Sequence, residues 1–68
     1  MDPETRISSL SSRELQIARA YAAGNGYRII AERLFIAPST VRTHLNTIYR
    51  KLGVSSKVDL LRALERRA

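Results

Sequence analysis

The sequence predicts an all-α fold, a compact four-helix bundle, and three features carry this prediction. Apolar residues recur at the spacing of one helix face, and no segment alternates as a half-buried strand would. Ser, Gly and Pro residues stand where helices begin and end. The 68 residues include no cysteine, so neither a disulfide nor a cysteine zinc site can reinforce the core. We therefore expect one small domain that helix packing holds together.

The first helix is expected to begin after Ser11. Ser11 and Glu14 have the spacing of a capping box, and Leu10 and Leu15 have the spacing of a hydrophobic staple around it. A Gly-Asn-Gly run that starts at Gly24 ends this helix.

The second and third helices are expected at residues 27–34 and 38–52, with only three residues between them. Pro38 suits the first position of the third helix, where its missing N–H costs nothing. Gly53 follows the last turn. Two helices joined this closely indicate a helix-turn-helix motif at about residues 25–45. The third helix has one apolar stripe at helical spacing, formed by Val41, Leu45, Ile48 and Leu52.

The last helix is expected at about residues 57–66. Ser56 and Asp59 resemble a second capping box at its start. Its apolar residues are Val58, Leu60, Leu61 and Leu64. Residues 1–9 look like a linker remnant or an artificial end, so we expect that the domain, residues 10–66, is part of something longer.

Positive charge is concentrated in the half of the chain that holds the third helix. Residues 25–68 carry the whole net charge of +6, and no acidic residue lies between Glu32 and Asp59. A merely solvated helix face usually mixes Glu with Lys. The acid-free face therefore indicates contact with a polyanion such as DNA, rather than the alternative of an ordinary bundle with a solvated face. That face carries Ser39, Thr43, Asn46, Thr47 and Arg50.

Five short segments keep the residues and spacing of a known protein family. They are LSSREL at 10–15, AG at 23–24, IAERL at 30–34, STVRTH at 39–44 and YRKLGV at 49–54. Together they resemble the LuxR/FixJ/NarL-type DNA-binding domain of bacterial transcription regulators. The resemblance implies sequence-specific binding of double-stranded DNA by a cytoplasmic effector domain, as in response regulators, with the third helix in the major groove.

The resemblance places three base-reading residues on the third helix: Arg42, Thr43 and Asn46. Arg42 can bond guanine O6 and N7, the Thr43 methyl can meet a thymine methyl, and Asn46 can pair with adenine. A surface role stays open for Arg42, as does a phosphate or water contact for Asn46. Contacts with the DNA backbone are expected from Ser39, Thr40, His44, Arg50 and Lys51, and from Arg28 in the second helix. For His44 a packing contact stays open.

Two positions depart from the family pattern at helix starts. Ala37 stands where a serine usually caps the third helix, so about 1 kcal/mol of capping stabilisation is expected to be missing. Gly26 replaces the usual polar cap of the second helix.

The last helix resembles the dimerisation element of the family, through Val58, Leu61 and Leu64. We expect a homodimer on DNA that reads half-sites about 10 base pairs apart, and a monomer is compatible with the isolated domain. RNA polymerase is a secondary partner in this hypothesis.

Other classes of function are disfavoured. No cofactor, metal site or membrane contact is expected, because His44 is the only histidine and the apolar stripe is needed for the core. The lack of paired carboxylates or an activated nucleophile argues against an enzyme. A basic helical module that docks an acidic protein partner stays open as the alternative. The tyrosines are expected in the core, with hydroxyls in water; they are Tyr21, Tyr27 and Tyr49.

Overall fold

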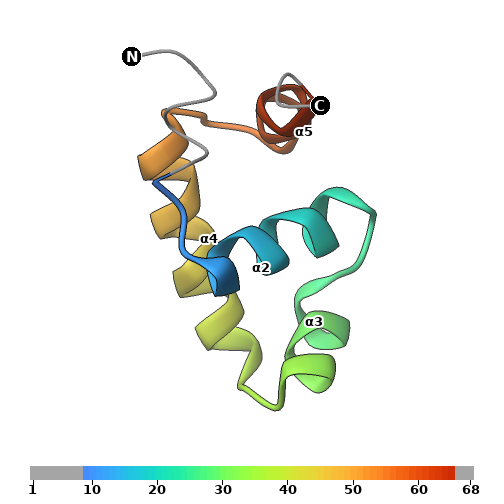
Figure 1. Ribbon diagram of the computed structural model, residues 1–68. Coiled ribbons are helices and arrows are strands. Elements are labelled where there is room, and N and C mark those ends of the chain that lie inside the picture. The colour runs from blue at the N-terminus through green and yellow to red at the C-terminus, as the bar shows by residue number, and fades with distance from the viewer. Residues whose placement is uncertain (1–8, 66–68) are drawn as a thin grey trace.

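Four helices make up the part of the chain that the computed structural model describes, residues 9–65 (Figure 1). They are α2 (Ser12–Ala22), α3 (Tyr27–Leu34), α4 (Pro38–Leu52) and α5 (Lys57–Glu65). The all-α prediction is confirmed. Most of the expected linker, and residue 66 at the expected domain end, lie outside the described residues.

α4, the longest helix, contacts each of the other three. α2 crosses it, and α3 and α5 lie on opposite sides of α2 in Figure 1. Each helix contributes to one buried cluster, in which no side chain is more than 3% exposed. The cluster contains Ile17, Ala18, Ile30, Ala31, Val41, Leu45, Ile48, Leu52 and Leu60. The predicted apolar stripe of α4 is therefore confirmed as the side of the helix that faces the core.

Serine caps begin the two helices that support the motif. The Glu14 N–H donates to the Ser11 hydroxyl at 3.1 Å, and the Ser11 N–H donates to the Glu14 carboxylate at 2.8 Å. The predicted capping box is confirmed. At the start of α5, the Asp59 N–H donates to the Ser56 hydroxyl at 3.1 Å.

The helices of the helix-turn-helix motif have no side-chain caps. Gly26 precedes α3 and Ala37 precedes α4, and neither supplies a capping hydrogen bond. α3 ends at Phe35, which adopts a left-handed conformation with φ of 58° and is 94% exposed. Such a backbone conformation costs a non-glycine residue about 1–2 kcal/mol. α4 ends as predicted at Gly53, where a φ of 68° suits glycine.

Three tyrosines pack against the core, as predicted, but burial of the Tyr49 phenol contradicts the prediction that all three hydroxyls lie in water. The Tyr21 and Tyr27 rings lie 5.7 Å apart between centroids, and the Lys57 ammonium lies 4.4 Å from the Tyr21 centroid. Burial raises the pKa of the Tyr49 phenol, and the neighbouring Tyr21 and Tyr27 add to the rise. These contacts attach α3 and α5 to α2.

Candidate nucleic-acid interface

The side of α4 that faces away from the core presents polar and basic side chains to solvent. α4 contains no acidic residue. His44 and Thr47 on its flanks are half-buried. The exposed polar and basic residues of α4 are Ser39, Thr40, Arg42, Thr43, Asn46, Arg50 and Lys51. The predicted polar face thus exists as a surface, and it belongs to the helix that contributes more residues to the buried cluster than any other.

The three predicted base-reading residues lie together on this face. Arg42 and Asn46 are four residues apart, so their side chains are neighbours on the helix surface. Thr43 lies three residues before Asn46 and neighbours it on the same face, and its hydroxyl donates to the Ser39 carbonyl oxygen at 3.1 Å. Because the hydroxyl proton is used within the helix, Thr43 offers a ligand its methyl group and its oxygen lone pairs. The set combines a forked cation, an amide and a methyl group, which suits base edges.

The predicted backbone contacts are divided between two helices. Ser39 and Thr40 lie in the first turn of α4, Arg50 lies in its last turn, and Arg28 lies in the first turn of α3. These four side chains are exposed. Cations and hydroxyls placed at both ends of a groove-binding helix can fix its register on the phosphates.

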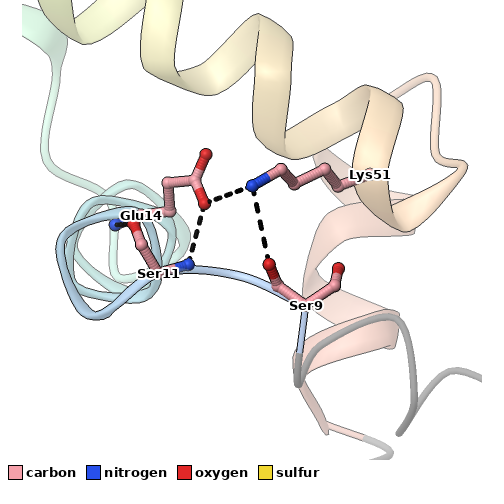
Figure 2. Close-up of polar contacts among 4 residues, drawn as sticks. All are labelled: Ser9, Ser11, Glu14 and Lys51. Carbon is pink, nitrogen blue, oxygen red and sulfur yellow. Dashed lines mark hydrogen bonds and ion pairs between the residues drawn. The ribbon is translucent and has the colours of Figure 1, made fainter.

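Lys51 differs from the other predicted backbone contacts because it already has a partner. Its ammonium donates to Glu14 Oε1 at 2.8 Å and to the Ser9 carbonyl oxygen at 3.5 Å (Figure 2). This is the one ion pair between side chains in the range 9–65. This contact does not test the prediction that Lys51 binds phosphate. It shows that the ammonium already bonds Glu14 and Ser9 in the domain without DNA.

Glu14 is the residue that sequence reasoning missed, since it was predicted only as a cap. It is the one charged residue in the described chain that is buried, at 7% exposed. The hydrogen bond from Lys51 lowers the pKa of its carboxyl, the Ser11 N–H lowers it further, and burial opposes them. No local spacing signals this pair, because the two residues are 37 positions apart.

The predicted dimerisation residues are not equally available on α5. Val58 is 56% exposed, and Leu61 is half-buried. Leu64 packs against the core, as does Leu60. The cause is geometric: at 100° per residue, Val58 and Leu61 point to one side of the helix and Leu60 to another.

Neither a membrane-spanning helix nor a metal-binding group occurs among residues 9–65. No helix there is long and apolar enough to cross a membrane. His, Cys, Asp and Glu residues do not gather in threes that could hold a metal ion in that range.

Comparison with known proteins assigns the family. The model for bacterial regulatory proteins of the luxR family matches residues 8–64. The putative HTH-type transcriptional regulator Mb0914c of Mycobacterium bovis is 42% identical over 65 residues, which are 96% of this chain and 7% of that protein. No solved structure matches significantly.

Two further relatives are shorter proteins. The probable transcriptional regulatory protein NarL of Mycobacterium tuberculosis is 46% identical over 48 residues, 71% of this chain and 22% of that protein. The oxygen regulatory protein NreC of Staphylococcus aureus is 46% identical over 52 residues, 76% of this chain and 24% of that protein. The chain thus spans less than a quarter of each relative. It belongs to the LuxR family of bacterial regulatory proteins and is a helix-turn-helix DNA-binding domain of that non-enzymatic family.

Proposed function

We propose that this domain recognises a specific sequence in double-stranded DNA by placing α4 in the major groove, as the effector domain of a cytoplasmic transcription regulator. The observation that carries the proposal is the exposed, acid-free face of a helix whose opposite face is fully buried. A major groove admits one such helix, and its base edges can be read by the side chains on that face.

Within this proposal, Arg42, Thr43 and Asn46 read bases. Ser39, Thr40, Arg50, Arg28 and the half-buried His44 contact the DNA backbone. Lys51 is left out of this set because Glu14 holds its ammonium at 2.8 Å.

Dimerisation on DNA is the second part of the proposal. The exposed Val58 and the half-buried Leu61 form a short apolar strip on α5. So small a strip gives a weak interface, so we expect pairing only when two half-sites hold two domains side by side. Sedimentation of the domain with duplexes that carry one or two half-sites tests this. Independent, non-cooperative filling of the two half-sites would contradict it.

The base-reading role is tested with a site selected from a random duplex pool at a stated salt concentration. Arg42→Ala should weaken binding to the selected site by about 1–3 kcal/mol and relax the preference at one base. Binding to random duplex should change much less. Arg50→Ala is the matched control, since a backbone contact should weaken both duplexes alike. Equal losses on both duplexes for Arg42→Ala would refute base reading by this residue.

A further inference from the structure

The last turn of α4 carries two adjacent cations in opposite situations. Arg50 is exposed and forms no ion pair with any residue in the described chain. Lys51 reaches across to the first turn of α2, where the Glu14 carboxylate accepts a hydrogen bond from its ammonium at 2.8 Å. Figure 2 shows the Lys51 side chain extended from α4 toward this cap. Neighbouring residues of the same charge therefore differ in their availability to DNA.

Capping alone does not require the Lys51 contact. A capping box is complete when Ser11 and Glu14 bond each other's backbone N–H groups, as they do here. Oε1 of Glu14 nevertheless accepts both the Ser11 N–H and the Lys51 ammonium, each at 2.8 Å. The Glu14 side chain is only 9% exposed. Removal of its cation would leave a buried charge unpaired, which is costly.

We propose that Glu14 is a positioning residue that withholds the Lys51 ammonium from DNA phosphates and so limits sequence-independent binding. The inference rests on the proposed docking of α4 in the groove. Each phosphate that a protein neutralises adds affinity for any duplex and about 0.9 to the slope of log affinity against log salt. A cation that a carboxylate holds neutralises no phosphate, so it adds nothing to that slope. Glu14 thereby sets how tightly the domain holds DNA that lacks its site.

The test is the salt dependence of binding to random duplex. Glu14→Gln keeps an acceptor for the Ser11 N–H, since glutamine completes a capping box, but it removes the charge that holds Lys51. We expect random-duplex affinity to rise by about three- to tenfold at 0.1 M salt, with a slope steeper by about 0.9. Lys51→Gln should have the same slope as the native protein, because Lys51 neutralises no phosphate in the native protein. The double variant should return the slope to the native value.

Two controls separate this effect from general charge and from the proposed function. Glu65→Gln makes the same charge change at an exposed position of α5 and should leave the slope unchanged. Arg50→Gln removes an available cation and should make the slope shallower by about 0.9. An unchanged slope for Arg50→Gln would mean that this end of α4 does not meet phosphate, and the proposed docking would fail.

Other outcomes would contradict the proposed role of Glu14 and leave the proposed docking of α4 intact. If Arg50→Gln behaves as expected but Lys51→Gln also makes the slope shallower, Lys51 already binds phosphate and Glu14 withholds nothing. If Glu14→Gln weakens cognate and random binding alike with no change of slope, its role is only structural. Circular dichroism checks that each variant is folded. Should Glu14→Gln not fold, the slope of Lys51→Gln decides alone.

Discussion

The two supporting helices and the two helices of the helix-turn-helix motif begin in different ways. α2 and α5 start with Ser11 and Ser56, whose hydroxyls each accept a backbone N–H at 3.1 Å. α3 and α4 start with Gly26 and Ala37, which supply no side-chain cap. Side-chain caps therefore stabilise the starts of the two supporting helices, α2 and α5, and not those of α3 and α4. The motif keeps helix starts without side-chain partners, an arrangement in which backbone N–H groups can face an anion.

Burial of an apolar side chain gives the largest expected effect, and two isoleucines in different helices compare it. Ile17 of α2 is fully buried, whereas Ile29 of α3 is 41% exposed. Ile17→Ala should lower the free energy of unfolding by about 2–5 kcal/mol because it removes core contacts and leaves a cavity. Ile29→Ala, the matched control, should cost less than about 1 kcal/mol. Urea unfolding measures the free energy of unfolding of both variants. Similar losses for the two would contradict the expected difference between the buried and the exposed isoleucine.

The helix caps give the next largest expected effect on stability. Removal of a cap from a supporting helix should destabilise the domain, and addition of a cap to a helix of the motif should stabilise it. Ser11→Ala should destabilise the domain by about 1 kcal/mol. Ala37→Ser should stabilise it by a similar amount, because Ala37 already has the extended conformation of an N-cap, with φ of −77° and ψ of 149°. Thermal unfolding detects both shifts. A neutral Ala37→Ser variant would show that the missing cap of α4 costs the domain nothing.

The contact between α5 and α2 gives a smaller effect. The Lys57 ammonium lies 4.4 Å from the centroid of the Tyr21 ring. Lys57→Met keeps the apolar stem of the side chain but removes the charge, so it should cost about 0.5–1 kcal/mol. Lys57→Arg should restore most of this. Chemical denaturation of the three proteins compares them, and a Met variant as stable as the native domain would rule out this cation–π contribution.

The ion pair between α2 and α4 should give the smallest effect, visible as a pH dependence. The hydrogen bond from Lys51 holds the pKa of Glu14 below its ordinary value of 4.5. A lowered folded-state pKa contributes stability above the unfolded value, and this contribution is lost as the pH falls through the folded value. Because the Lys51 side chain is 37% exposed, we expect the pair to contribute less than about 1 kcal/mol.

Unfolding of the native domain and of Glu14→Gln at several pH values measures this contribution. The stability difference between them should be largest near neutral pH and should shrink as the medium becomes acidic. A difference that stays constant below pH 4.5 would show that the carboxylate charge does not stabilise the fold.

The helix boundaries could be predicted because the residues that set them act locally. Gly26 and Pro38 fix helix starts, Gly53 fixes an end, and the structure gives α3 and α4 the predicted bounds. The apolar stripe of α4 could be predicted for the same reason, since its period depends only on helix geometry. That stripe in turn located the exposed face on which the candidate site lies.

Contacts between distant segments could not be predicted. The Glu14–Lys51 pair joins residues 37 positions apart, and it depends on the angle at which α2 crosses α4. The tyrosines were expected in the core from their type, but their mutual contacts depend on how three helices meet. Val58 was grouped with Leu60 as apolar, and only the rotation of α5 in the fold separates their exposures.

Phe35 also makes the turn of the motif accessible to spectroscopy. It is the only phenylalanine of the chain, and 94% of it is exposed at the turn before α4. A fluorinated phenylalanine incorporated during expression would therefore give a single fluorine resonance. Its chemical shift would report whether the turn approaches a bound duplex, with every side chain of α4 left native.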